Sequence, residues 1–267
     1  MAPEVALDGG FALITGVASN VGEEIAIAFA HSGAEGILLE VPELPTAEAV
    51  AEKCRKHAHH PRFRVIVAKE QTDNDGSATN LVDTAVRAFG RLDYCVHFSM
   101  TLGLRQHDHP DMFQTAIDTY VKSTLSILYA ASLEMSKQEP RVQSTVRHGH
   151  MRSLGRGSIV VVNPVSSTMV TVGPVLYVAC KHAVHNMVKA IAVDNVNCHI
   201  RVNSVCPYLI KSSSQCDIGS PRNLATPEDI ADAVLFLSSP AARSISAESL
   251  VVDGGYSLSP IKMRLLS

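Results

Sequence analysis

The sequence lacks the features that mark several large classes of protein. No stretch approaches the ~18 consecutive apolar residues of a membrane span. The six cysteines include no CxxC pair, and in a chain of 267 residues they do not form a disulfide framework. Lysine and arginine are scattered and the formal net charge is -3, so no basic stripe is available for nucleic acid. We therefore expect no nucleic-acid partner and no membrane partner.

Other absences concern the location of the protein and its order. The first residues, Met1-Ala2-Pro3-Glu4, lack the basic segment and the apolar run of a signal peptide. No internal repeat occurs, and 46% hydrophobic with 18% charged residues is too apolar for disorder or low-complexity assembly. We expect a soluble, cytoplasmic protein whose thiols are reduced and mostly buried. Its length fits one domain over residues 1–267, since doubly wound α/β domains commonly reach about 250 residues.

Short β-branched runs alternate with longer helical patterns along the chain. Strands are predicted at residues 11–15, 36–40, 63–68, 92–97, 158–162, 200–206 and 250–252. Helices are predicted around residues 21–29, 46–58, 81–89, 112–138, 174–197 and 226–238. Several strands are apolar at successive positions, as parallel strands buried on both faces are. The pattern predicts an α/β fold, a Rossmann-like doubly wound parallel sheet of about seven strands.

One stretch interrupts this alternation. Residues 138–155 (QEPRVQSTVRHGHMRSLG) are polar, basic and without a period. We interpret them as a surface insertion.

The first predicted strand is joined to its helix by a glycine-containing turn, residues 15–22 (TGVASNVG). Gly16 and Gly22 would let the backbone approach a pyrophosphate at the helix N-terminus, with Asn20 between them. About 20 residues later Glu40 ends the second strand, where an acid binds adenosine ribose hydroxyls and repels a 2′-phosphate. Taken alone, the turn is equally typical of an ordinary strand–helix connection, and Glu40 of a solvated carboxylate.

A second candidate pair lies on the helix predicted at 174–197. Tyr177 and Lys181 are four residues apart, so the phenol and the ammonium share one helix face. A nearby ammonium favours phenolate and lowers a tyrosine pKa. A bare YxxxK pattern is also common on ordinary helix surfaces.

The order of these elements resembles the short-chain dehydrogenase/reductase family over nearly the whole chain. The resemblance rests on residues 89–93 (FGRLD), Tyr177 with Lys181, residues 201–207 (RVNSVCP), residues 226–231 (TPEDIA) and residues 251–255 (VVDGG). It implies that Tyr177 is the acid/base and that Lys181 binds the nicotinamide ribose and lowers the tyrosine pKa. In the family a serine orients the substrate carbonyl and an asparagine holds a relay water. The family also implies a homodimer or homotetramer through its two long helices.

The chain departs from the family where the chemistry takes place. Asn20 replaces a glycine of the turn, and His97-Phe98-Ser99-Met100 replace Asn-Asn-Ala-Gly after the fourth strand. Tyr120 stands in place of the relay asparagine and Pro164 in place of the serine. Tyr208 replaces a glycine that lies beside the nicotinamide in the family. Each change adds bulk or removes a hydrogen-bonding group. The sequence therefore predicts a partly filled, apolar substrate pocket, lined by Phe98, Met100, Tyr120, Pro164, Ser166 and Tyr208.

Three functions stay open at this point. We favour a non-redox enzyme that performs ring closure, cycloaddition, isomerisation or elimination on a small apolar substrate. The alternatives are an NAD(H)-dependent dehydrogenase or reductase, and a catalytically silent scaffold. We expect cofactor binding to be absent or weak, with NAD(H) preferred over NADP(H) because of Glu40. The KHAV run at 181–184 and the polar insertion suggest fungal specialised metabolism by resemblance.

The histidines form short clusters at residues 57–60, 107–109 and 148–150. Zinc needs converging ligands, and cysteine or carboxylate partners at supporting spacing are missing here. We predict a solvated surface and no metal site.

Overall fold

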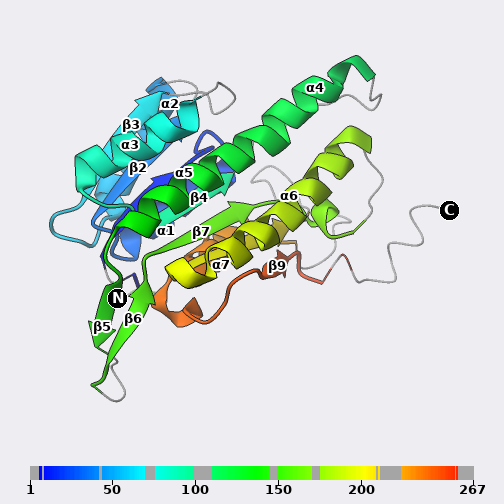
Figure 1. Ribbon diagram of the computed structural model, residues 1–267. Helices are drawn as coiled ribbons and strands as arrows, with labels where there is room; N and C mark the ends of the chain where they lie inside the picture. Colours follow the sequence, from blue (N-terminus) through cyan, green and yellow to red (C-terminus); the bar gives the residue numbers. More distant parts are fainter. Residues whose placement is uncertain are drawn as a thin grey trace.

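The computed structural model describes residues 6–7, 9–41, 44–69, 76–98, 110–144, 149–169, 175–208, 210, 224–255 and 257. Its centre is a seven-stranded sheet in which every neighbouring pair is parallel (Figure 1). In spatial order the strands are β3 (Arg64–Lys69), β2 (Gly36–Val41), β1 (Phe11–Ile14), β4 (Tyr94–Phe98), β7 (Gly157–Val162), β8 (Ile200–Pro207) and β9 (Ser249–Val252). The predicted doubly wound sheet is confirmed. Its strand order reverses between β1 and β4, where ligands of such sheets bind.

Helices cover both faces of the sheet (Figure 1). The helices are α1 (Asn20–His31), α2 (Leu44–His57), α3 (Ser77–Phe89), α4 (Phe113–Ala116), α5 (Ser123–Lys137), α6 (Val175–Asp194) and α7 (Pro227–Ser238). One core cluster joins α1, α2 and α7 to the sheet, and the other joins α3, α5 and α6. Successive residues of β1 alternate between the two clusters, because side chains along a strand point to opposite faces. The side chains on both faces of β1, β2, β7 and β8 are buried, which explains the unbroken apolar runs of these strands.

The long helix predicted at 112–138 is not a single regular helix. A 3₁₀ turn over Pro110–Met112 leads into α4, a π-helical turn follows over Ile117–Lys122, and α5 then continues to Lys137. A π turn adds a residue to the helical repeat, and such turns are frequent at functional sites. The turn lies beside α6 and carries Tyr120.

The stretch predicted as an irregular insertion forms a β-hairpin instead. β5 (Arg141–Ser144) and β6 (Met151–Gly155) pair in the antiparallel direction, with a register shift next to Arg141. Figure 1 shows the hairpin projecting past the end of the central sheet. In both strands exposed side chains alternate with half-buried ones, the exposed ones being Val142, Ser144, Met151 and Ser153. The prediction missed the hairpin because this alternation extends over too few positions to give a clear period.

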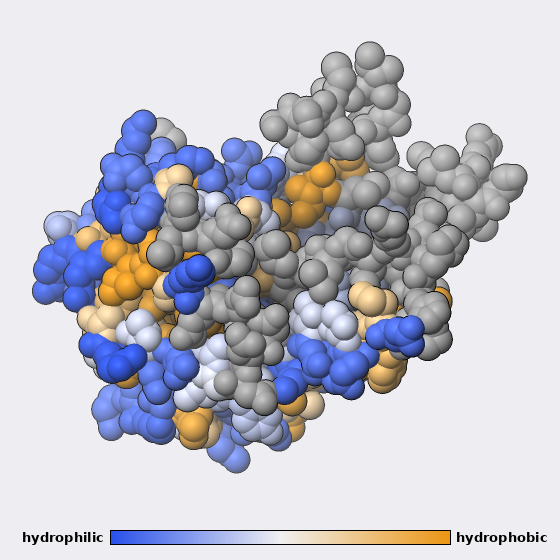
Figure 2. Space-filling model, turned by 90° about the horizontal axis from the view of Figure 1, so that it is seen from above, coloured by the Kyte–Doolittle hydropathy of each residue, from blue (hydrophilic) through white to orange (hydrophobic). Residues whose placement is uncertain are grey.

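Within the described residues, five cysteines are free thiols and four of them are buried. Burial raises the pKa of both Cys54 and Cys95 to about 12, so these thiols stay protonated and unreactive. None of the helices in the described part of the chain is long and apolar enough to cross a membrane. Among the coloured residues of the face seen in Figure 2, hydrophilic side chains predominate and apolar ones form a few patches.

Asp93 ties together the amino ends of the strands. Its carboxylate accepts a hydrogen bond from the backbone N–H of Phe11 at 3.0 Å and from Arg91 Nε at 2.8 Å. Arg141 Nε of the hairpin lies 4.0 Å from the same carboxylate. Because Asp93 is buried, losing its carboxylate would leave a buried N–H and an arginine without their acceptor.

We predict that Asp93→Ala lowers the free energy of unfolding by about 2–3 kcal/mol, since a buried donor loses its partner. Asp93→Asn keeps an acceptor for Phe11 and should lose less. Urea unfolding followed by circular dichroism measures both. An alanine variant as stable as the wild type would show that the carboxylate does not hold this edge.

Candidate functional site

Tyr177 and Lys181, the predicted catalytic pair, lie on α6 next to the π turn that carries Tyr120. The Lys181 ammonium is 4.5 Å from the centroid of the Tyr120 ring and 5.5 Å from that of Tyr177. The two rings meet edge to face, with centroids 5.5 Å apart and planes at 84°. Lys181 is only 1% exposed. Two aromatic faces therefore stabilise its charge through cation–π contacts.

Tyr120 is held in this position by its own helix. It is 0% exposed, and its carbonyl accepts a hydrogen bond from Thr124 Oγ1 at 2.7 Å. Ser123 bonds the Thr119 carbonyl in the same way. The sequence predicted that Tyr120 lines a substrate pocket, and the structure places its ring against Tyr177 and Lys181.

Burial controls the protonation of Lys181. Removal from water lowers its pKa from 10.5 to about 8. No carboxylate of the described residues forms an ion pair with it. Below pH 8 the site thus contains an ammonium ion whose nearest partners are aromatic rings.

His97 is a site residue whose role the sequence analysis did not identify. The side chain is buried at the end of β4, with Nδ1 2.9 Å from Thr15 Oγ1 and Nε2 3.2 Å from Thr124 Oγ1. Burial, and then the charge of Lys181, lower its pKa to about 3. The imidazole is therefore neutral at physiological pH and links the glycine turn to α5. Its place at a strand end, where the family has asparagine, was the available signal.

Asn163 is a second residue that was missed. It is fully buried and donates from Nδ2 to the backbone carbonyl of Lys181 at 3.1 Å. Its Oδ1 is buried without a hydrogen-bond partner. Asn163 thereby connects the end of β7 to α6. A polar side chain at the end of an apolar strand was its only signal in the sequence.

Pro164 follows Asn163 and opens a 3₁₀ turn over Val165–Ser167. Ser166 in this turn is buried, and its Oγ has no hydrogen-bond partner. Buried polar atoms are rarely left unpaired, so a ligand or a water is expected to satisfy these groups. Tyr208 is half-buried after β8, and Met100 lies outside the described residues.

The glycine turn is built tightly. Gly16 has φ +72°, and a Cβ there would lie 2.4 Å from the carbonyl oxygen of Phe98. A Cβ on Gly22 would meet the Gly16 carbonyl oxygen at 2.3 Å. Asn20 is exposed as the first residue of α1, after its N-cap Ser19. Only glycine is accommodated at 16 and 22, whereas position 20 tolerates a side chain.

Glu40 is not the solvated carboxylate that the sequence left open. It is 6% exposed, and its Oε2 accepts a hydrogen bond from the backbone N–H of Gly16 at 3.0 Å. The turn, the start of α1 and this carboxylate together fit the adenosine and pyrophosphate part of a dinucleotide.

The histidine clusters do not gather into a metal site in the part of the chain that is described. No group of three or more His, Cys, Asp or Glu side chains is placed there to hold an ion. His31 and His59 pack ring against ring, with centroids 4.2 Å apart. The prediction for residues 107–109 and for His148 falls outside the described residues.

Comparisons with known proteins identify the family to which the fold belongs. The family described as "Enoyl-(Acyl carrier protein) reductase" matches residues 16–257. The protein named "Short-chain dehydrogenase srdC" from Neurospora crassa is 33% identical, over 93% of this chain and 97% of its own length. "Short-chain dehydrogenase fogB" from Aspergillus ruber is 30% identical, over 93% and 97%.

Solved structures share the fold. A short-chain type dehydrogenase/reductase from Mycobacterium marinum has a TM-score of 0.80 at 24% identity and covers 95% of this chain and 97% of its own. The structure of "7 alpha-hydroxysteroid dehydrogenase complexed with NADH and 7-oxo glycochenodeoxycholic acid" has a TM-score of 0.79 at 26% identity, covering 96% and 97%. The chain belongs to the short-chain dehydrogenase/reductase family.

Proposed function

We propose that this protein is an acid–base enzyme whose active site is the Tyr177–Lys181 pair, and that it catalyses a non-redox reaction. The main observation in support of an acid–base role is the packing of the Lys181 ammonium against the rings of Tyr120 and Tyr177. A ring closure, cycloaddition, isomerisation or elimination needs a shaped pocket and one or two polar groups.

In this mechanism the Tyr177 hydroxyl donates a proton to the substrate or removes one from it. The Lys181 ammonium favours the phenolate that forms when the proton leaves. Tyr120 fills the volume beside both groups, so the lysine is held by a ring where the family has a water-holding asparagine. Asn163 fixes the lysine backbone from the other side.

The replacements around the pair support a non-redox reaction. Pro164 has no hydroxyl to orient a substrate carbonyl. Phe98 packs on Gly16, and Tyr208 carries bulk where the family has glycine. We propose that the substrate is a small apolar, ring-bearing metabolite, held in part by Ser166. The similarity to named short-chain dehydrogenases of fungi supports a role in fungal specialised metabolism.

An NAD(H)-dependent dehydrogenase is the second candidate, and Glu40 is the observation that favours it. Its carboxylate, held on the Gly16 N–H, would bind ribose hydroxyls and repel a 2′-phosphate. The Gly16–Gly22 turn would hold the pyrophosphate and Lys181 the nicotinamide ribose. A bound nicotinamide would supply or accept a hydride, with Tyr177 moving the proton. A silent scaffold remains the third candidate.

Self-association is part of the proposal. Leu125, Tyr129 and Leu133 form an exposed stripe at helical spacing along α5, and Val175 and Val193 are exposed on the neighbouring α6. We propose that these faces pair in a homodimer or homotetramer. A cytoplasmic location accords with the free, buried thiols.

The first test is calorimetric titration with NAD, NADH, NADP and NADPH. For a non-redox enzyme we expect no dissociation constant tighter than about 1 mM, because the proposal has Phe98 and Tyr208 crowd the cofactor cleft. Micromolar binding of NAD or NADH would favour the dehydrogenase. In that case Glu40→Gln should weaken NAD binding and raise the relative affinity for NADP.

The second test uses product mass. Wild-type protein is incubated with ring-bearing ketones and alkenes, with and without NADH. Products of unchanged mass, or lighter by one water, indicate isomerisation, cyclisation or elimination. A change of two hydrogen atoms indicates redox chemistry. Tyr177→Phe should reduce the rate by at least about a hundredfold, since it removes the proton donor. Tyr129→Phe, on an exposed tyrosine of α5, is the matched control, and equal rates in the two variants would exclude Tyr177.

A third test concerns the buried ammonium. The folded pKa of Lys181, about 8, lies below its unfolded value of roughly 10.4. The unfolded chain therefore binds more protons between these values, and folding stability rises with pH in this window. Relative to Lys181→Met, the wild type should gain up to about 3 kcal/mol between pH 7 and pH 10.5. Lys189→Met, at an exposed position of α6, should show no such trend in urea unfolding. A flat difference for Lys181→Met would mean that the ammonium is solvated.

A further inference from the structure

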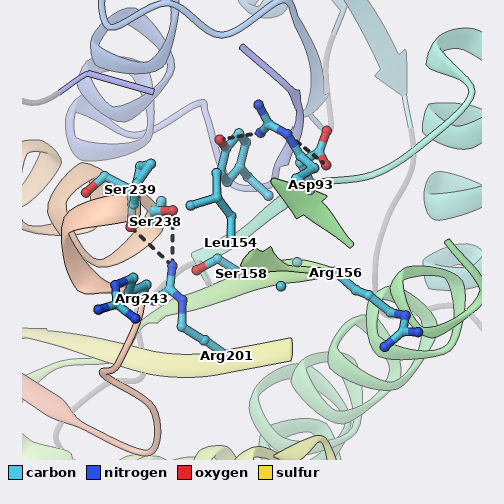
Figure 3. Close-up of a pocket in the computed structure, with 13 residues that line it drawn as sticks. Asp93, Leu154, Arg156, Ser158, Arg201, Ser238, Ser239 and Arg243 are labelled. Carbon is cyan, nitrogen blue, oxygen red and sulfur yellow. Dashed lines mark hydrogen bonds and ion pairs between the residues drawn. The ribbon is translucent and has the colours of Figure 1, made fainter. Parts of the chain in front are cut away.

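A cavity lies at the amino ends of β4, β7 and β8, away from Tyr177. It is lined by these strand ends, by the β5–β6 hairpin and by the C-terminal end of α7 (Figure 3). Its volume is about 20 Å³, which is room for about one water, or for one oxygen of an oxyanion whose other atoms lie outside the cavity. The catalytic proposal gives this cavity no role.

The lining is strongly cationic. Of the described residues around the cavity, Asp93 alone carries a carboxylate, against four arginines: Arg141, Arg156, Arg201 and Arg243. Asp93 is already shared by Arg91 and Arg141. Arg156 points away from the cavity in Figure 3 and donates to the carbonyls of Gln138 and Cys198. The charge that faces the cavity without an anionic partner thus comes from Arg201 and Arg243.

Arg201 is the decisive group because it is buried. It is 9% exposed and lies at the start of β8. Its two terminal nitrogens donate to the carbonyls of Leu237, Ile245, Ser238 and Ser239 at 2.6–3.4 Å. These carbonyls belong to the end of α7 and the segment after it, and they carry no net charge. Its Nε is buried, and none of the described residues accepts a hydrogen bond from it.

A buried cation is ordinarily paired with an anion, and a buried donor with an acceptor. Burial lowers the pKa of Arg201 to about 10, and no carboxylate of the described residues forms an ion pair with it. Arg243 is exposed on the turn after α7, without a carboxylate partner among the described residues, and Figure 3 shows it on the same side of the cavity as Arg201.

We propose that this cavity is a binding site for a small oxyanion, a phosphate or carboxylate group held between Arg201 and Arg243. Guanidinium groups bind such oxygens through charge-assisted hydrogen bonds. The exposed position of Arg243 lets the rest of a larger ligand extend into solvent. The site would also join the end of α7 to the β5–β6 hairpin.

The experiment is calorimetric titration of the full-length protein with sodium phosphate, sodium acetate and sodium chloride at matched pH and ionic strength. We expect saturable binding of phosphate or acetate with a dissociation constant on the order of 1 mM. Arg243→Gln should weaken it by about tenfold or more, since one charge-assisted contact is lost. Arg87→Gln, at an exposed arginine of α3 without an ion pair, should bind as the wild type does.

Arg201→Lys keeps the charge but removes the Nε–H, and should also weaken binding if it folds. Tighter binding of phosphate than of acetate would assign a phosphate group, and the reverse a carboxylate. Absence of saturable binding to either, binding of chloride alone, or equal affinity in wild type and Arg243→Gln would each overturn the proposal. None of these outcomes bears on the Tyr177 site.

Discussion

The active-site region depends on the burial of one ammonium group with no carboxylate beside it. Lys181 is removed from water. Two tyrosine rings offset part of the desolvation free energy of its ammonium through cation–π contacts, and its other neighbours are uncharged. His97 is part of the same constraint, because its low pKa keeps a second positive charge out of the site. The acid–base role that we propose for Tyr177 rests on this balance, since no carboxylate of the described residues pairs with the lysine's charge.

The fold was almost entirely predictable, whereas the site was predictable only in part. The positions of the central strands follow from their unbroken apolar runs, because β1, β2, β7 and β8 are buried on both faces. The helices follow from their 3.6-residue period. Tyr177 and Lys181 were predicted as a catalytic pair from their spacing and the family resemblance, and the structure places both beside the Tyr120 ring. The π turn that carries Tyr120 was not predicted, because one residue added to a helical turn leaves no pattern in a single sequence. The hairpin was missed for a similar reason: its strands are too short to show a period.

Glu40 shows how geometry decides between two interpretations of one residue. At the end of β2, a carboxylate is equally consistent with ribose binding and with solvation. Its burial and its hydrogen bond from Gly16 exclude solvation. The same bond stiffens the turn in the protein alone, so the carboxylate has a structural role whether or not a dinucleotide binds. A retained Glu40 is therefore weaker support for redox chemistry than its position in the family pattern suggests.

Each end of the parallel strands has a buried cation, and the two cations are stabilised by different groups. At the carboxyl edge, aromatic rings stabilise Lys181, and a ring is a fixed partner that cannot leave. At the amino edge, main-chain carbonyls satisfy the terminal nitrogens of Arg201 but leave its charge and its Nε–H unmatched. Lys181 is stabilised by side chains of the protein itself and needs no ligand. Arg201 has a buried donor without an acceptor, and a bound anion would supply that acceptor. For that reason the amino edge, although it contains no part of the family's catalytic motif, is the better place to look for an anion.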